Sequence, residues 1–127
     1  AHVGPMRIRA CSVHTEVATL SPPKRRKQFA AIADVTSAGP DELLVIGGDF
    51  NTLTRRGIEA VTSSLSSIDA HRATEGAGPT LRRGGREFSL DHIYTRSFTP
   101  ISCGVVAGLS ASDHRPIWAR LAPQVTA

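Results

Sequence analysis

The stretch that most constrains the fold is residues 42–46, ELLVI, in which four apolar side chains follow one carboxylate. A strand with one solvated face alternates apolar and polar residues, and this run does not alternate. We therefore expect a strand whose two faces are both covered by other parts of the chain.

The flanking segments predict the order β-α-β-α-β-β-β. Strands are expected where side chains alternate with period two, and helices where apolar residues recur at helical spacing. Strands are expected at 6–16, 42–46, 87–96, 101–107 and 117–121, helices at 21–39 and 56–70, and a glycine-rich loop at 73–85. This order predicts an α/β fold of the α+β type, with one mixed sheet, both helices on one face, and the other face open.

Individual side chains also carry positional expectations. Ser21 is the expected N-cap of the first helix, and Trp118 is expected in the core. Cys11 and Cys103 lack metal-ligand spacing, so we expect reduced, packed thiols, with a single bridge as the alternative. The residues expected to face the sheet are Phe29, Ile32 and Val35 in the first helix and Ile58, Val61 and Leu65 in the second.

Composition fits one folded domain over residues 1–127. A hydrophobic content of 40%, with 11 glycines and 8 prolines, is typical of a loop-rich globular chain and excludes a disordered one. No apolar run approaches the roughly 20 residues of a membrane-spanning helix, and no secretory signal pattern opens the sequence. The net charge is +4 and 13 of the 15 basic residues are arginine, which favours a phosphate-bearing partner, although genomic base composition can also enrich arginine.

Polar residues stand at the ends of several expected strands. Asp49 and Asn51 follow the apolar run, His14 lies late in the first strand, Asp91 interrupts an apolar strand, and 113–114 precede the last strand. If the strand continued through Asn51, alternation would aim Asp49 and Asn51 the same way. Each feature alone has a structural explanation, such as a turn, a cap or an edge histidine. Together they favour a cleft at one end of the sheet.

These motifs resemble the endonuclease/exonuclease/phosphatase superfamily, the deoxyribonuclease I-like phosphodiesterases. The resemblance rests on VHTE followed by R-x-x-Q at 25–28, on GGDFNT, on SLDHIY and on SDHRPIWARL, in that order along nearly the whole chain. It implies a four-layer α/β/β/α sandwich of two similar halves. This chain is similar to the C-terminal half.

The resemblance also implies catalytic roles. Asp49 would orient or deprotonate the attacking water, and Asn51 would hydrogen-bond the scissile phosphate. His114 would contact a non-bridging phosphate oxygen or act as an acid–base partner. Asp91 would hold the imidazole of His114 in one tautomer.

The resemblance also implies that the set of metal ligands in this chain is incomplete. Asp113 is the residue expected to bind or support Mg²⁺ or Mn²⁺, and His14 would be a second phosphate-contacting histidine. Family enzymes supply a metal-binding glutamate and a further asparagine from the N-terminal half, and residues 1–13 here contain no carboxylate. We therefore expect the C-terminal half of the site to be present and the whole site not to be.

The expected function is metal-dependent hydrolysis of a phosphodiester, nucleic acid or phospholipid, by in-line attack of water. The alternative is a non-catalytic phosphate-binding half-domain that pairs through its open sheet face as a homodimer. In the enzyme hypothesis, the partner would be the missing N-terminal half. The arginines of 81–87 either line the cleft and touch substrate or belong to a flexible surface loop. The cations of 24–27 are expected to be a solvated helix start, with a phosphate-facing role as the alternative. No compartment follows from the sequence.

Overall fold

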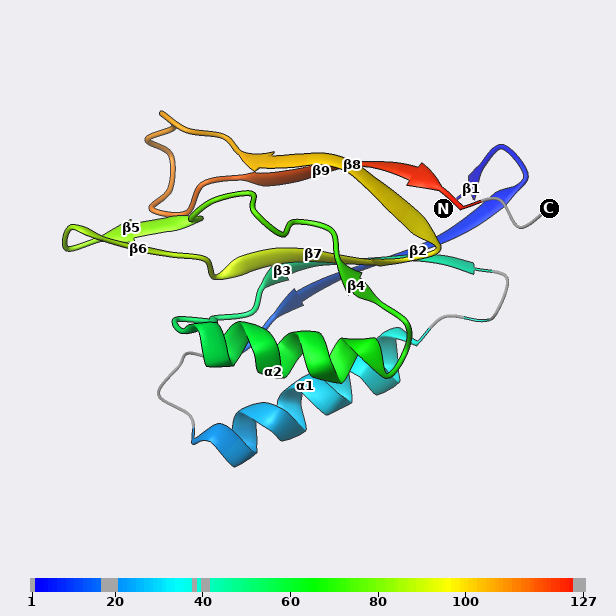
Figure 1. Cartoon of the computed structure of the whole chain (residues 1–127), viewed down its shortest axis with the longest axis horizontal. Coiled ribbons are helices and arrows are strands. Elements are labelled where there is room, and N and C mark those ends of the chain that lie inside the picture. Colours follow the sequence, from blue (N-terminus) through cyan, green and yellow to red (C-terminus); the bar gives the residue numbers. More distant parts are fainter. Residues whose placement is uncertain (1, 17–20, 38, 40–41, 125–127) are drawn as a thin grey trace.

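The computed structural model describes residues 2–16, 21–37, 39 and 42–124 of the 127-residue chain (Figure 1). The helices are α1 (Pro22–Thr36) and α2 (Arg55–Ser66). The strands are β1 (His2–Val3), β2 (Met6–His14), β3 (Glu42–Asp49), β4 (His71–Arg72), β5 (Leu81–Arg83), β6 (Arg86–Phe88), β7 (Asp91–Arg96), β8 (Phe98–Val105) and β9 (Ile117–Pro123). No helix among the described residues is long and apolar enough to cross a membrane.

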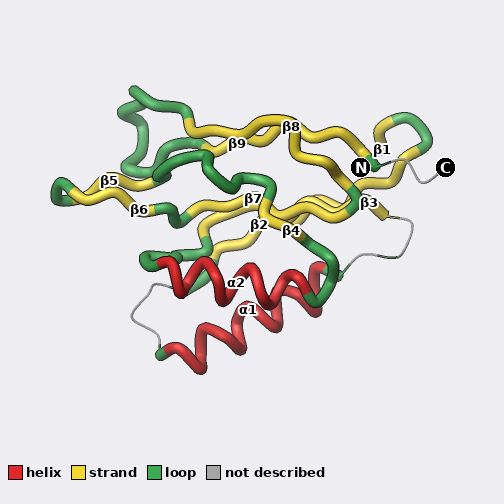
Figure 2. Tube along the Cα trace, in the orientation of Figure 1, coloured by secondary structure: helices red, strands yellow, loops and turns green. Residues whose placement is uncertain are grey.

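The main sheet has the order β1-β2-β3-β7-β4. β2 and β3 run parallel, as expected for strands joined through a helix, whereas β7 is antiparallel to β3. Both helices lie on one face of this sheet (Figures 1 and 2). The expected mixed α/β fold is therefore confirmed, and the short edge strands β1 and β4 are additions to it.

The β8–β9 hairpin forms a separate two-stranded sheet on the side of the main sheet away from the helices (Figure 1). The expectation that these strands continue the main sheet was wrong. Ser97, directly after β7, has a φ of 63°, and this left-handed turn carries the chain out of the sheet. The face expected to be open is thus partly covered by the chain's own last two strands. The homodimer stays a prediction.

The core lies between the main sheet and the helices. Leu44, Ile46 and Tyr94 of the sheet are fully buried there against Phe29, Val61 and Leu65 of the helices and against Phe50. Val35 was expected in this core and is instead 76% exposed. Six residues after Phe29, it has turned far from the buried side of α1. Positions four and seven residues after Phe29, Ala33 and Thr36, face the core.

Trp118 was also expected in the core, and it is 44% exposed. Alternation along β9 half-buries Ile117, Ala119 and Leu121 and leaves Trp118 on the opposite face of the hairpin. There its ring covers Gly104 on β8, to which it is paired in register. The two cysteines are free and half-buried, as predicted.

Residues 73–85, expected to be a loop, contain the first strand of the β5–β6 hairpin. Gly84 and Gly85 have φ values of 57° and 73°, which suit a tight two-residue turn between Arg83 and Arg86. The expected strand 87–96 is correspondingly divided into β6 and β7. α2 ends at Ser66, four residues early, in a series of turns that leads to a left-handed Asp69.

Candidate active site at the end of the main sheet

Three predicted site residues form one row across three neighbouring strands. His14 ends β2, Asp49 ends β3 and Asp91 begins β7, and the register pairs His14 with Asp49 and Asp49 with Asp91. Residues in register on adjacent strands point to the same face of a sheet. This row therefore places an imidazole and two carboxylates side by side.

Glycine allows β3 to reach this row. A Cβ on Gly48 would lie 1.9 Å from the carbonyl oxygen of Val13, and its φ is 149°. Only a residue without a side chain fits where β2 approaches so closely. The Gly-Gly pair before Asp49 is thus explained by the packing of β2 on β3, and β3 extends three residues beyond its expected end at Ile46.

His114 reaches the same row from the segment before β9. Its Nδ1 donates to Asp91 Oδ2 at 2.8 Å, and its Nε2 lies 4.0 Å from Asp49 Oδ2. Burial opposes the charged imidazole, but the hydrogen bond to Asp91 and the charges of Asp91, Asp49 and Asp113 outweigh it and raise the pKa of His114. His114 is therefore held in one orientation and favoured in its protonated form.

His14 lies on the side of Asp49 opposite Asp91 within the row. Its Nε2 lies 3.8 Å from Asp49 Oδ2, and its side chain is 76% exposed. Asp49 Oδ2 thus stands between two imidazoles. Within the described part of the chain it accepts no hydrogen bond, since Asn51 N donates to the other oxygen, Oδ1.

Asn51 joins the site through a turn and not through strand alternation. β3 ends at Asp49, and Asn51 has a left-handed φ of 48°. Its backbone N–H donates to Asp49 Oδ1 at 2.7 Å, and its side-chain Nδ2 donates to the carbonyl of Thr15 at 2.8 Å. The strand does not continue through Asn51, so alternation does not align the two side chains, but Asp49 and Asn51 do lie together.

Arg25 supports this turn. The expectation that it belongs to a solvated helix start was wrong, because its side chain is half-buried against the turn. Its guanidinium donates to the carbonyl oxygens of Phe50 at 2.9 Å and Asn51 at 3.0 Å, and also to that of Glu16. Gln28, one helical turn on, accepts from the Glu16 N–H. Since Arg25 and Gln28 form the R-x-x-Q pattern, that spacing lets one helix face hold two loops of the site.

His92 lies behind the site and points away from the row, as its neighbour position to Asp91 predicts. Thr52 Oγ1 gives its proton to the carbonyl of Ser89, so His92 Nε2 must donate to Thr52 Oγ1, at 2.7 Å. Burial, followed by the charge of Arg72, lowers the pKa of His92 to about 4. His92 is thus a neutral core histidine whose partner, Thr52, the sequence did not suggest.

Asp49, Asp91 and His114 bring one ligand atom each to within 4.8 Å of one another, a spacing that can hold a metal ion. Asp49 Oδ2 is the carboxylate oxygen still available, because Asp91 Oδ2 is bonded to His114. Oxygen ligands of this kind suit Mg²⁺ or Mn²⁺. Asp113 is exposed and lies outside this group, so its metal role stays a prediction.

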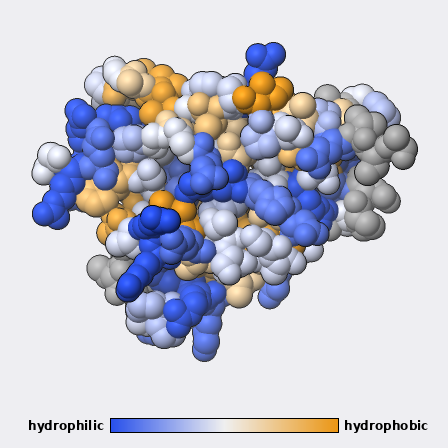
Figure 3. All heavy atoms as spheres, in the orientation of Figure 1, coloured by the Kyte–Doolittle hydropathy of each residue, from blue (hydrophilic) through white to orange (hydrophobic). Residues whose placement is uncertain are grey.

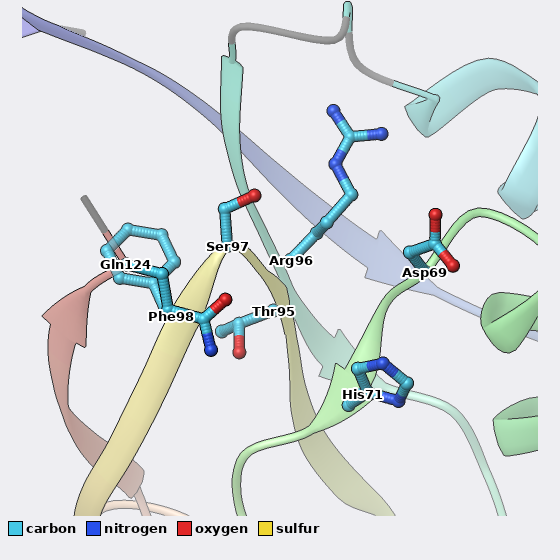
Figure 4. Close-up of a pocket in the computed structure, with 7 residues that line it drawn as sticks. All are labelled: Asp69, His71, Thr95, Arg96, Ser97, Phe98 and Gln124. Atoms are coloured by element: carbon cyan, nitrogen blue, oxygen red, sulfur yellow. The ribbon is translucent and has the colours of Figure 1, made fainter. Parts of the chain in front are cut away.

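Two cavities lie near opposite ends of β7. One of about 280 Å³ borders Asp91 and is also lined by Arg72, Thr74 and Ile117. A larger one of about 780 Å³ lies at the Arg96 end of this strand and is lined by Thr95, Arg96 and Phe98 among others (Figure 4). The Arg96 guanidinium donates to backbone carbonyls, including that of Glu42. It is therefore already occupied and is not available to bind an anion in the larger cavity. Of the row, only Asp91 lines the smaller cavity.

Several solved structures share the fold of this chain. D. rerio TDP2 in complex with a single-stranded DNA product is 18% identical with a TM-score of 0.68, over 87% of this chain and 54% of that one. A humanized D. rerio TDP2 with 14 mutations is 16% identical with a TM-score of 0.68, over 91% of this chain and 55% of that one. The Bacteroides thetaiotaomicron mannosyl-6-phosphatase is 19% identical with a TM-score of 0.60, over 81% of this chain and 47% of that one. The chain spans about half the length of these structures, and the likeness shows a shared fold. A search of curated proteins finds no match.

A family model settles the affiliation. It matches residues 7–114, a span that includes the row of His14, Asp49 and Asp91 and extends to His114. This chain belongs to the Endonuclease/Exonuclease/phosphatase family.

Proposed function

We propose that this chain carries the phosphate-binding and proton-transfer half of a metal-dependent phosphodiester hydrolase, corresponding to the C-terminal half of the family's domain. The observation that carries the proposal is the Asp91–His114 hydrogen bond of 2.8 Å beside Asp49. A carboxylate that fixes Nδ1 leaves Nε2 free to face a substrate.

Each residue of the row has a chemical task in this proposal. Asp49 Oδ2 orients the attacking water or accepts its proton, because no donor among the described residues occupies this oxygen. His114 Nε2–H donates to a non-bridging oxygen, where negative charge grows in the transition state. Asn51 keeps its second amide N–H for the phosphate after bonding Thr15. His14 contributes a further donor from the exposed side.

Asp49 and Asp91 would hold a cation at this edge, with Asp113 as a candidate outer ligand. A cation held there, such as Mg²⁺ or Mn²⁺, would supply Lewis-acid stabilisation of the phosphoryl oxygens. One of the two carboxylates is shared with His114, so the described residues provide only part of a six-coordinate set. The remaining ligands would come from water, substrate or polypeptide outside this chain, such as the family's glutamate.

The test is hydrolysis of a bis-aryl phosphodiester in Mg²⁺ or Mn²⁺ by the natural chain, His114→Ala and Asp49→Asn. Loss of a general acid or base typically lowers the rate by about 10²–10⁴-fold, and we expect this for both variants. His71→Ala is the matched control, because His71 is exposed at the far end of β7. Metal-dependent turnover that both site variants retain would contradict the proposal. Phosphate binding without any turnover would favour the non-catalytic alternative.

A further inference from the structure

The β5–β6 hairpin places two like charges directly opposite each other. Arg83 and Arg86 are paired in register on either side of the Gly84–Gly85 turn. Like charges directly opposite each other on paired strands destabilise a hairpin. The hairpin extends beyond the main sheet at the end where β2 stops, and its tip is strongly hydrophilic (Figures 1 and 3).

Neither guanidinium at the tip is neutralised by the chain as far as the structure describes it. The hairpin's carboxylate, Glu87, is 2.7 Å from Arg82 and 3.8 Å from Arg115, which leaves Arg83 and Arg86 without an ion pair among the described residues. A solvated surface pair would explain two exposed arginines, but not why they face each other while the carboxylate serves their neighbours.

The base of the hairpin is fixed to the Asp91–His114 pair. Thr80, which is fully buried, accepts from the Asp91 N–H at 3.1 Å through its hydroxyl, and its carbonyl accepts from the Arg115 N–H at 2.7 Å. Leu81 forms a β-bridge with His114. Arg83 is two residues beyond that bridge, about 7 Å along the strand. The two arginines are therefore held at a set distance from His114.

We propose that residues 81–88 form a substrate-binding arm that takes a second phosphate group of the substrate between Arg83 and Arg86. This inference rests on the proposed function, and it specifies the substrate as one with a phosphate close to the scissile one. Successive phosphodiesters of a single-stranded nucleic acid supply this, and so does a small molecule with two phosphates. An arginine fork matches phosphate oxygens, and such a phosphate removes the repulsion between the paired charges.

The test is anisotropy titration of a fluorescent single-stranded oligonucleotide in chelator, so that binding is read without hydrolysis. Arg83→Gln with Arg86→Gln should weaken binding about 3- to 30-fold. The slope of log affinity against log salt should also fall by about 0.7, the contribution of the one phosphate that the two arginines share on a single strand. Unchanged affinity and an unchanged slope would contradict the proposal that residues 81–88 bind a phosphate.

Arg7→Gln with Arg120→Gln is the matched control, because it removes the same charge at positions outside the arm and the site row. An equal loss in this control would show a general charge effect and would also overturn the arm. Competition by a nucleoside 3′,5′-bisphosphate that depends on the same two arginines would identify the small-molecule source. Competition by oligonucleotide alone would identify the strand.

Failure of the arm and failure of the proposed function can be told apart. The arm variant should hydrolyse the bis-aryl phosphodiester as fast as the natural chain, because that substrate has one phosphate and does not reach Arg83 or Arg86. Binding that depends on Arg83 and Arg86, without any hydrolysis, would support the substrate-binding arm and contradict the proposed hydrolase function. Hydrolysis without arginine-dependent binding would do the reverse.

Discussion

His114 and Asp91 are separated by 23 residues in the chain, and His114 Nδ1 donates to Asp91 Oδ2 at 2.8 Å. Asp91 belongs to the main sheet, whereas His114 comes from the segment that leads into the separate β8–β9 hairpin. The hydrogen bond therefore joins two layers of the fold. It leaves His114 Nε2 as the nitrogen nearest Asp49.

Replacing Asp91 should lower the pKa of His114. Asp91→Asn removes both the charge and the charged acceptor that favour the imidazolium, while the opposing burial remains. NMR titration of the His114 imidazole in the two proteins measures the shift. Asp113→Asn is the control, because Asp113 acts on His114 only through charge and most weakly. An equal fall in both variants would show that the hydrogen bond is not decisive.

The two glycines before Asp49 should differ in their tolerance of alanine. Gly48→Ala puts a Cβ against the backbone of Val13 and should cost about 3 kcal/mol or more of unfolding free energy. Gly47→Ala places its Cβ 3.8 Å from the nearest atom, on Ile93, and should cost far less. Urea denaturation of both variants gives the comparison. Similar midpoints would contradict the close approach of β2.

Arg25→Gln should destabilise the turn that holds Asn51. The carbonyls of Phe50 and Asn51 lose a charged donor, and a lost bond of this kind costs about 2 kcal/mol. Arg26→Gln removes the same charge from an exposed neighbour and should have little effect. Denaturation midpoints and the amide signal of Asn51 report stability and position separately. A loss as large in the Arg26 variant would point to helix charge instead.

Stability should fall as the pH is lowered from about 6.5 to about 4. The unfolded chain protonates His92 near 6.5, and the folded chain does so near 4, so the unfolded state binds more protons throughout this window. A shift of this size is worth about 3 kcal/mol. Urea denaturation across that range should show a weaker pH dependence for His92→Gln. An unchanged dependence would mean that other groups cause it.

Strand-end motifs predicted the site better than periodicity predicted the packing. Asp49, Asp91 and His114 were expected together because Asp49 follows an apolar strand, Asp91 interrupts one and His114 precedes one. The register that aligns Asp49 with Asp91 was not expected. It depends on how β2, β3 and β7 pair, and the local sequence does not determine how distant segments pair. The role of Arg25 likewise depends on where α1 packs relative to the turn at Phe50.

Errors in the expected fold have local physical causes. The separate β8–β9 sheet follows from the turn at Ser97, a residue type that seldom adopts a left-handed conformation, so nothing nearby signals it. The exposure of Trp118 follows from the same separation, because the outer face of that hairpin has no layer above it among the described residues. Hydrophobicity alone assigned this side chain to the core.

The most direct measurement is an NMR map of Mn²⁺ broadening with diethyl phosphate present as a slowly hydrolysed phosphodiester. If Asp49, Asn51 and His114 face one phosphate beside a cation, their signals should broaden first, and Asp49→Asn should abolish the effect. Glu75→Gln, which alters an exposed carboxylate away from the row, should leave it unchanged. Broadening that spares these three residues, or that survives Asp49→Asn, would contradict the assignment of the site.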